Sequence, residues 1–533
     1  MQQLSRTQML ERVRSKTTPW DMVIIGGGAT GVGVAVDAAS RGYEVLLLEQ
    51  NDFGKGTSSR STKLVHGGVR YLEQGNIPLV MEALKERGLL RQNAPHLVHD
   101  LPFIVPNYDW WEAPFYGMGL KVYDLLAGKF GFGKSRILSK EEILKELPTI
   151  KTEGLRGGVI YYDGQFDDSR LLINLVSTGI ESGATMLNYT SVIGLVKDDE
   201  GYIDAVTVRD VETGAEFFVK GKVVVNATGA FTDGVRKLAD EQVSPMIAPS
   251  QGIHLVFPRS LMPGSSAIMV PHTSDGRVMF AIPWHDHVLV GTTDTPIDAP
   301  TLEPKPFEQE INFILETASK YLARPPLREE VLSVFVGIRP LVKAAGAGST
   351  AALSRDHTIH IDSSGLLTIC GGKWTTYRKM AEDGVDHALT LAKLDEKPCV
   401  TKNLKIHGSN GNETDEGPLS FYGSDVAKIL ALSKAEPKLA EQLDEALPHI
   451  AAQVIWAVRF EMARTVEDFL ARRVRALFLN SASAMRMAPK VAALMAAELG
   501  KDEQWQKEQV RQFTELAKQY QMSEVPNPSL VGR

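Results

Sequence analysis

One short stretch near the start of the chain restricts the fold more than any other. An apolar segment, residues 21–25, leads directly into Gly26, Gly28 and Gly31, which have the G-x-G-x-x-G spacing. The first glycine permits a tight turn, the second admits a pyrophosphate close to the backbone, and the third lets a helix pack on the strand. The helix predicted over 32–41 would direct its N-terminal amides at that pyrophosphate. The stretch therefore predicts a βαβ unit that binds a dinucleotide.

The second predicted strand, residues 44–49, ends in Glu49. A carboxylate at this distance from the glycine turn can accept hydrogen bonds from ribose hydroxyls. The alternative is an ordinary βαβ unit with a glycine turn, which leaves Glu49 without a role. The two features together favour a dinucleotide, but they suit NAD as well as FAD.

Composition narrows the class of protein. With 533 residues, of which 43% are hydrophobic, the chain can form two or three domains with large cores. A net charge of −7 gives no basic face for nucleic acid. The two cysteines, Cys370 and Cys399, lack metal-ligand spacing, so we expect no metal, no disulfide and a reducing, cytoplasmic setting. No apolar run reaches the roughly 20 residues that span a bilayer, although surface attachment stays open.

Three later segments have the composition of a cofactor site. Residues 51–73 are dense in glycine and hydroxyl side chains, which suits a loop around a polar cofactor better than a plain surface loop. The apolar run 223–229 ends in Ala-Thr-Gly and would lie beside the first strand. Residues 366–377 predict a strand, a glycine pair and a helix start. Short strands over 246–290 predict an antiparallel sheet, and the chain beyond 412 reads as helical.

Residues 108–136 differ from the rest of the chain. They concentrate aromatic residues and interleave them with Lys121, Lys129, Lys134 and Arg136. Aromatic and basic residues on one amphipathic element suit a membrane interface. A helical lobe with internal aromatic residues explains the pattern equally well, so both interpretations stay open.

Together these segments closely resemble one family, the FAD-dependent, respiratory glycerol-3-phosphate dehydrogenases. The motifs that carry the resemblance are residues 26–31, 57–73, 162–168, 226–229, 337–341, 371–378 and 465–473. They occur in the family's order and extend over nearly the whole chain, which makes them far more specific than one glycine turn.

The resemblance implies an α/β fold, α+β overall, with three parts. A Rossmann-like FAD-binding domain would consist of residues 1–97, 151–245 and 331–400. An inserted antiparallel β-sheet domain for substrate would consist of 98–150 and 246–330, and 401–533 would form a helical C-terminal domain.

The resemblance also makes non-covalently bound FAD the expected cofactor, because several glycine- and hydroxyl-rich segments would surround one large molecule. We expect the FAD-binding residues to be Gly26, Gly28, Ala29, Thr30, Gly31, Glu49, Thr57, Ser58, Ser61, Thr62, Lys63, His66, Gly67, Ala227, Gly229, Gly372, Lys373, Trp374 and Thr375.

The implied reaction is oxidation of sn-glycerol 3-phosphate to dihydroxyacetone phosphate, with hydride passing from substrate C2 to FAD N5. A phosphate dianion requires fixed cations, and the C2 hydroxyl requires a proton acceptor. By resemblance, Arg70, Tyr71, His254, Arg339 and Lys373 bind substrate, and His254, Arg339 and Lys373 are catalytic.

Alternative roles remain for these residues. His254 matches the family's proposed acid–base position, but Arg339 could stabilise the alkoxide while water takes the proton. His66 is the other candidate base, although its loop favours cofactor contact. Arg70 and Arg339 could instead form structural ion pairs, and Lys373 could be a surface lysine.

The electron acceptor separates the competing functions. The resemblance implies a membrane quinone and peripheral association with the inner face of the membrane, with the possible formation of a homo-oligomer. A glycerol-3-phosphate oxidase that uses O2 and makes H2O2 is the nearest rival, but such oxidases carry an insertion that we do not find in this sequence. More distant alternatives are an amine or amino-acid flavin oxidase and a non-catalytic flavin-binding scaffold.

Overall fold

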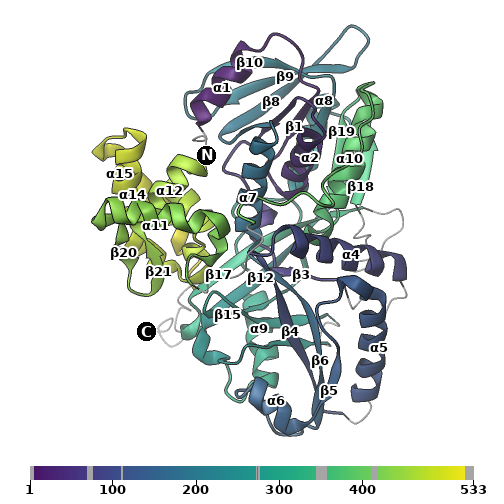
Figure 1. The fold of residues 1–533 in the computed structure, drawn as a ribbon, viewed down its shortest axis with the longest axis vertical. Helices are drawn as coiled ribbons and strands as arrows, with labels where there is room; N and C mark the ends of the chain where they lie inside the picture. Colours follow the sequence, from purple (N-terminus) through teal and green to yellow (C-terminus); the bar gives the residue numbers. More distant parts are fainter. Residues whose placement is uncertain are drawn as a thin grey trace, which may run out of the picture.

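The computed structural model describes residues 5–68, 76–109, 112–271, 273, 277–343, 357–409 and 417–522. Two large sheets follow one another along the long axis of the molecule, and a mainly helical C-terminal region lies to one side of them (Figure 1). The first sheet and its helices lie at one end, the second sheet at the other, and the C-terminal region lies beside the junction.

The first sheet contains the predicted βαβ unit. It has six strands in the order β18–β19–β11–β1–β2–β7, all parallel except β18. Their bounds are His357–Ile361, Leu367–Gly371, Val224–Asn226, Met22–Ile25, Val45–Leu48 and Thr185–Leu187. Every residue of β1 and β2 is buried, which explains their continuous apolar runs.

Helices and a small sheet cover the first sheet. Helix α2 (Ala29–Ser40) packs between α7 (Asp168–Glu181) and α10 (Tyr377–Leu391). Around them lie α1 (Arg6–Ser15), α8 (Thr232–Ala239) and the antiparallel sheet of β8 (Thr190–Lys197), β9 (Ile203–Asp210) and β10 (Glu216–Lys220).

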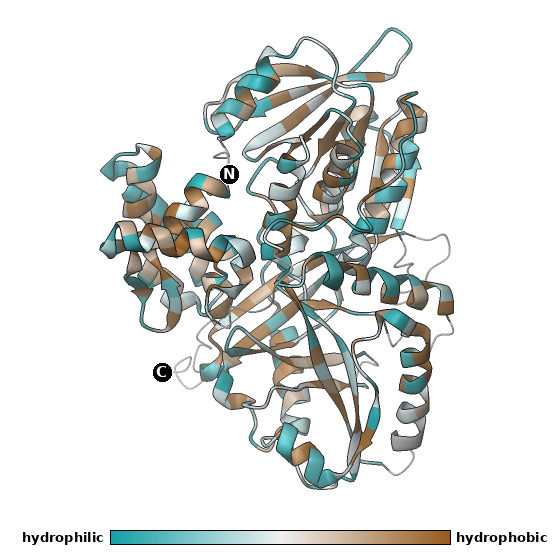
Figure 2. Ribbon diagram, viewed as in Figure 1, coloured by the Kyte–Doolittle hydropathy of each residue, from teal (hydrophilic) through white to brown (hydrophobic). Residues whose placement is uncertain are grey.

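The second sheet has ten strands and is largely antiparallel, and Figure 2 shows its strands in mainly hydrophobic colours. The order is β16–β12–β15–β14–β13–β4–β6–β3, with β17 also paired to β12 and β5 to β6. The bounds are Thr295–Pro296, Ile247–Pro258, His287–Gly291, Met279–Trp284, Ala267–Val270, Val98–Asn107, Gly157–Phe166, Leu64–Val65, Ser333–Val342 and Arg136–Leu138. Helices α4 (Ile77–Asn93), α5 (Glu112–Ala127), α6 (Lys140–Glu146) and α9 (Glu308–Tyr321) flank it.

The second sheet differs from the expected division of the chain in two ways. Strands β6 and β17, which we expected in the FAD-binding domain, pair with β4 and β12 of this sheet. Strand β13 pairs with β4 in parallel rather than antiparallel fashion. Both differences come from pairing between strands that are far apart in sequence, which local patterns do not specify.

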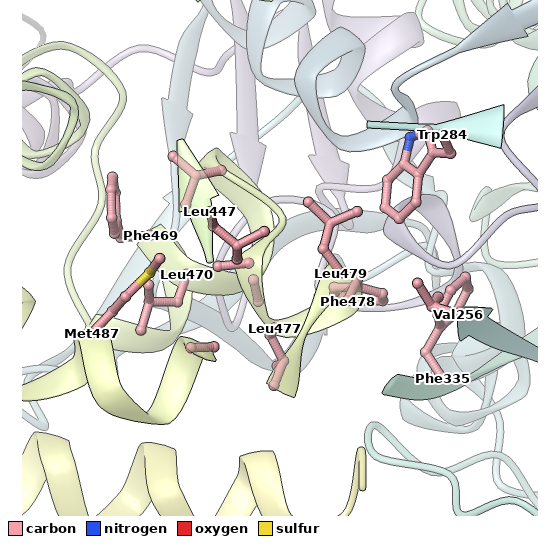
Figure 3. Packing of buried hydrophobic residues seen from close by; sticks show 14 of the residues in the cluster. Val256, Trp284, Phe335, Leu447, Phe469, Leu470, Leu477, Phe478, Leu479 and Met487 are labelled. Atoms are coloured by element: carbon pink, nitrogen blue, oxygen red, sulfur yellow. The ribbon is translucent and has the colours of Figure 1, made fainter. Parts of the chain in front are cut away.

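We call residues 417–522 the cap. Its elements are α11 (Val426–Ala435), β20 (Gln442–Asp444), β21 (Leu447–Ile450), α12 (Ala451–Phe460), α13 (Ala476–Leu479), α14 (Ser481–Leu499) and α15 (Glu503–Lys518). Figure 3 shows Leu477, Phe478 and Leu479 of the cap close to Val256, Phe335 and Trp284 of the second sheet. The cap and the sheet therefore share one hydrophobic core.

A half-buried histidine also links the cap to helix α7, which covers the first sheet. The Nε2 atom of His407 lies 2.6 Å from Asp425 Oδ2, and its Nδ1 atom lies 2.8 Å from Glu181 Oε1. Burial lowers the pKa of His407, but Asp425 and Glu181 outweigh burial and raise it to about 9. The protonated imidazolium thus bridges helix α7 and the start of the cap.

This bridge makes stability depend on pH. Because the folded pKa lies above the unfolded value of about 6.5, the contribution is complete below pH 6.5 and is lost as pH rises through 9. At pH 6 we expect the free energy of unfolding of wild type to exceed that of His407→Gln by on the order of 2 kcal/mol. This difference in stability should narrow by pH 10. Thermal scans of both proteins across this range measure it, and a gap of constant size would contradict the bridge.

Candidate active site

A cavity of about 600 Å³ lies where the two large sheets meet. It is lined by segments that are distant in the sequence, and sixteen of the nineteen residues expected to bind FAD line it. They are Gly26, Gly28, Ala29, Thr30, Glu49, Thr57, Ser58, Ser61, Thr62, His66, Ala227, Gly229, Gly372, Lys373, Trp374 and Thr375. The other three, Gly31, Lys63 and Gly67, lie behind the lining.

The glycine turn has the close approaches that the spacing predicts. Gly26 has a φ of +110°, which L side chains rarely adopt. A Cβ on Gly31 would lie 2.0 Å from the Gly26 carbonyl oxygen, so only glycine lets α2 begin so near β1. Gly28 precedes the first turn of α2, and its face is open except for Ser58 Oγ at 3.1 Å from an added Cβ. A pyrophosphate fits this cradle of helix N-terminal amides.

Glu49 is held in place by two backbone amides. Its Oε2 atom accepts from Gly27 N at 2.7 Å and its Oε1 atom accepts from Asn51 N at 2.8 Å. Each carboxylate oxygen keeps a further lone pair. Glu49 is therefore oriented to accept ribose hydroxyls, as its position after β2 predicts.

The hydroxyl-rich loop is fastened to both halves of the cavity. Thr57 Oγ1 donates to the Ile338 carbonyl of β17 at 2.6 Å. Trp374 Nε1 donates to the Ser58 carbonyl at 2.9 Å, which joins the loop to the glycine pair before α10. The loop is thus part of a fixed wall.

Lys63 is a buried ion-pair partner. Its Nζ atom lies 2.7 Å from Asp168 Oδ2, and both side chains are fully buried. Burial lowers the pKa of Lys63 to about 8, although Asp168 opposes this shift. The rings of Phe335, Trp284 and Phe478 lie 5.0, 5.3 and 5.6 Å from Nζ. Lys63 therefore places a positive charge behind the cavity wall.

Asp52 joins the loop to the cap. It accepts hydrogen bonds from Arg472 Nε at 2.5 Å and from Arg473 at 2.7 and 2.9 Å, and all three residues are buried. Burial opposes ionisation of Asp52, but Arg473 and Arg472 outweigh it and hold the pKa at about 2.

Removing this carboxylate should destabilise the protein strongly. Asp52→Ala leaves two buried guanidinium groups without their shared anion, and we expect a loss of about 3 to 5 kcal/mol together with weaker FAD retention. Thermal melting and the flavin content after gel filtration measure both effects. Glu216→Ala, at an exposed pair with Arg209, is the control and should change little.

His254 lines the cavity from β12. It is 2% exposed, its Nε2 atom lies 3.0 Å from Thr62 Oγ1, and its ring stacks on Phe335 with centroids 4.8 Å apart. The Nδ1 atom has no hydrogen-bond partner within the part of the chain that the structure describes. Burial, and then the charges of Lys63 and Arg339, hold the pKa of His254 well below its usual value, so the ring is neutral at pH 7.

Arg339 lies on β17, the strand beside β12. Its guanidinium donates to Asp294 at 3.3 Å, to Thr292 Oγ1 at 3.2 Å and to the Thr293 carbonyl at 2.9 Å. A Cβ on Gly252 would lie 2.6 Å from Arg339 Nη2, so glycine at that position leaves the guanidinium its room. The ion pair that we considered as an alternative role for Arg339 thus exists, and it orients a side chain that also lines the cavity.

The remaining substrate candidates are placed differently. Lys373 precedes the short helical turn at Trp374–Thr376 and lines the same cavity as His254 and Arg339. Arg70 and Tyr71 fall outside the described residues. The structure therefore brings together three of the five expected substrate residues.

The sequence analysis did not identify Thr292, Asp294 or Glu310. Glu310 of α9 accepts from Gln251, Thr293 and Thr295, and so supports the wall beside Arg339. The polar run Thr-Thr-Asp at 292–294, directly after the buried strand β15, was the available signal. This run meets Arg339 because β12 pairs with both β15 and β17 and so brings the two strands close together.

Two kinds of feature are absent from the described part of the chain. No group of three or more histidine, cysteine or acidic side chains there could hold a metal ion. None of the helices in that part is both long and apolar enough to cross a bilayer.

Comparison with known proteins identifies the family. A family model described as FAD dependent oxidoreductase matches residues 21–378, and one described as the C-terminal domain of alpha-glycerophosphate oxidase matches residues 399–507. A mitochondrial glycerol-3-phosphate dehydrogenase of Arabidopsis thaliana is 42% identical over 95% of this chain and 87% of its own length. That of Rattus norvegicus is 40% identical over 93% and 73%.

Solved structures agree with this assignment. The glycerol-3-phosphate dehydrogenase of Bacillus halodurans, complexed with FAD, aligns with a TM-score of 0.80 at 29% identity over 98% of this chain and 99% of its own. The L-alpha-glycerophosphate oxidase of Mycoplasma pneumoniae aligns with a TM-score of 0.55 at 17% identity over 73% and 98%, a likeness of fold alone. The predicted fold class and FAD as the cofactor are confirmed. The chain belongs to the family of FAD-dependent glycerol-3-phosphate dehydrogenases.

Proposed function

We propose that this protein oxidises sn-glycerol 3-phosphate to dihydroxyacetone phosphate. The observation that carries the proposal is that His254 and Arg339 line the same cavity as the pyrophosphate cradle at Gly26–Gly31. A neutral, buried base and an oriented guanidinium are the groups that oxidation of a phosphorylated alcohol requires. FAD, when bound, supplies the acceptor for the hydride that leaves C2.

Arg339 binds and orients the substrate. Its guanidinium is always charged and is held by Asp294 and the backbone at Thr293. It can donate to phosphate oxygens, or to the C2 oxygen as negative charge develops there. Lys373 adds a second cation from the opposite wall of the cavity.

His254 takes the proton of the C2 hydroxyl. When Nε2–H donates to Thr62 Oγ1, the lone pair of Nδ1 is the available acceptor. Burial keeps the imidazole neutral, so the base is in its active form at neutral pH. The Thr62 hydroxyl, 3.0 Å from Nε2, holds the ring in place, which makes Thr62 a positioning residue.

Anaerobic addition of glycerol 3-phosphate to the FAD-loaded protein tests the reaction. We expect the oxidised flavin absorbance to bleach, with one dihydroxyacetone phosphate formed per flavin. Bleaching by D-amino acids or amines instead, or no bleaching at all, would sink the proposal and favour an amine-type oxidase or a non-catalytic scaffold.

We further propose that the electrons pass to a quinone at the inner face of the membrane. Exposed apolar side chains on α4, α5 and β5 support membrane contact. Met118, Val122 and Leu125 of α5 are 72%, 41% and 80% exposed, and their spacing places them on one helix face. Ile77, Met81 and Ile137 are the exposed apolar residues of the two adjoining elements. We call these six residues the apolar face.

The charges around the apolar face suit an anionic lipid surface. Lys121 and Lys129 are exposed on and after α5, and Arg136 is exposed at the start of β5. Cations beside exposed apolar side chains favour headgroups of opposite charge. Tyr123, by contrast, is buried and bonded to Asp163, so this aromatic residue of the 108–136 segment is internal core.

A vesicle assay tests the membrane contact. Wild type should co-sediment with phosphatidylglycerol vesicles, and the double variant Met118→Glu/Leu125→Glu should stay largely in the supernatant. Phe218→Glu is the matched control, because Phe218 is also 72% exposed but lies on β10, in the small sheet. Equal sedimentation of all three proteins would place the contact elsewhere.

The acceptor is tested separately from the membrane contact. After anaerobic reduction, reoxidation by a soluble quinone such as menadione should be much faster than reoxidation by air-saturated buffer. The reverse order, with stoichiometric H2O2, would favour the oxidase, whose name the C-terminal family model carries.

A further inference from the structure

A second cavity, of about 540 Å³, lies between the cap and the second sheet. The proposed reaction uses none of the residues that line it. Its walls come from β4, β6, the β14–β15 hairpin and the cap hairpin β20–β21, and five of the protein's twelve histidines line it. These are His96, His99, His285, His287 and His449.

Several buried nitrogen atoms of this lining have no hydrogen-bond partner among the described residues. Both ring nitrogens of His449, Trp284 Nε1 and His96 Nδ1 are in this state, and His449 and Trp284 are each 4% exposed. Buried polar groups are normally paired, and a group left without a partner costs about 1 to 3 kcal/mol. Such atoms beside a cavity indicate a ligand that is not part of the chain.

The protonation states of these groups show what the ligand must offer. Asn174 uses its oxygen to accept from Arg170 and its nitrogen to donate to His96 Nε2, so the proton of neutral His96 is on Nδ1. Burial is the main cause that lowers the pKa of His96 to about 4 and of His449 to about 3, so both rings are neutral at pH 7. His96, Trp284 and His449 therefore each bring one N–H group without an acceptor.

The charged residues of the lining add two more donors. The Nε atoms of Arg170 and Arg475 are buried and also lack hydrogen-bond partners in the described chain. The buried carboxylates nearby are already engaged, since Glu461 accepts from Arg170, and Asp167 lies 2.9 Å from His285 Nε2. Two further acidic residues, Asp286 and Glu445, are exposed. The interior of the cavity thus has an excess of donors over free acceptors.

We propose that this cavity binds a small organic anion through its carboxylate or phosphate oxygens, which accept from Trp284, His449 and His96. Oxyanions are acceptors only, with several lone pairs each, so one group can satisfy several of these donors. Phe166, Leu447 and Leu479 supply apolar wall for the carbon skeleton, and the volume suits a metabolite rather than a macromolecule.

The site adjoins the machinery behind His254. Trp284 has one face toward Lys63, whose Nζ atom lies 5.3 Å from its ring centroid. Lys63 in turn contributes to the low pKa of His254. A ligand on Trp284 is therefore placed to alter turnover without occupying the substrate site.

Calorimetric titration of the FAD-loaded full chain tests the proposal, with inorganic phosphate and citrate as the two probes. The Arg339→Ala variant lacks the main anion-binding group of the first cavity, so a probe that still binds this variant binds outside that cavity. We expect at least one probe to bind Arg339→Ala with wild-type affinity and to bind Arg339→Ala/His449→Phe about tenfold or more weakly. Binding of phosphate alone indicates a phosphate ester, and binding of citrate alone a carboxylate.

Two further variants distinguish loss of a ligand-binding group from general damage to the fold. His387→Phe alters an exposed histidine of α10 outside the cavity and should leave affinity unchanged. Trp284→Phe keeps an aromatic ring over Lys63 and removes only the N–H donor, so it should weaken binding while FAD content and melting temperature stay normal. Failure of both probes to bind Arg339→Ala, or undiminished binding by both His449→Phe and Trp284→Phe, overturns the proposal. Neither result bears on glycerol 3-phosphate oxidation.

Discussion

His254→Ala should slow anaerobic flavin reduction by glycerol 3-phosphate by roughly 10²- to 10⁴-fold, the range typical of general acid–base catalysis. The expectation rests on a neutral imidazole that is 2% exposed, oriented by Thr62 and beside Arg339 in the cavity. Stopped-flow absorbance at saturating substrate measures the rate directly, without the acceptor step. FAD content should stay normal, because the cofactor cradle lies at the other end of the cavity.

A matched histidine variant and a pH profile separate catalysis from structure. His387→Ala alters a histidine of α10 that lines neither cavity, and in this variant the flavin should be reduced at the wild-type rate. Because burial lowers the pKa of His254, the loss of kcat/KM that its protonation causes should begin below pH 6.5. In His254→Gln this loss of kcat/KM at low pH should disappear, and only the ionisation of the substrate phosphate should then make kcat/KM depend on pH. An unchanged reduction rate in His254→Ala would assign the base elsewhere, with His66 and water as the next candidates.

Arg339→Ala should lower kcat/KM by roughly 10²- to 10³-fold, with a higher KM and slower turnover, while FAD stays bound. Charge-assisted hydrogen bonds contribute about 1.5 to 3 kcal/mol each, and a guanidinium can form two with one phosphate. Thr292, Thr293 and Asp294 already hold the side chain, so it loses little conformational entropy when substrate binds. Steady-state kinetics with a quinone acceptor give both parameters.

The conservative variant sharpens this test. Arg339→Lys retains the charge but not the planar fork, so it should recover only part of the lost kcat/KM. Added guanidinium ion should raise the rate of Arg339→Ala and leave Arg339→Lys nearly unchanged. Normal kinetics for Arg339→Ala would remove this residue from the substrate site.

The cofactor end of the cavity was largely predictable because its determinants are local. Positive φ at Gly26 and the 2.0 Å approach at Gly31 are properties of a few consecutive residues, and the sequence shows them as a glycine pattern. The antiparallel sheet predicted from short strands over 246–290 is likewise present, since β14 pairs with β13 and β15, and β15 pairs with β12, all in antiparallel fashion. Family resemblance added FAD, which the glycine turn alone did not distinguish from NAD.

The substrate end was predictable only in part. Resemblance named His254 and Arg339 but not what holds them, because Asp294 is 45 residues from Arg339 and meets it through strand pairing. Lys63 illustrates the same limit. The sequence places it in the hydroxyl-rich loop, but its ion pair with Asp168, 105 residues away, and its electrostatic effect on His254 are visible only in the folded chain.

What the sequence determined by itself was therefore the dinucleotide turn, the order of strands and helices along the chain, and the residue types of the site. Tertiary structure alone decided that β6 and β17 join the second sheet, that the cap shares its core, and that residues distant in sequence line two cavities. The physical reason is the range of the forces involved. Neighbouring residues determine backbone conformation and burial pattern. Strand pairing, ion pairing and cavity shape depend instead on contacts between distant segments, which only folding brings together.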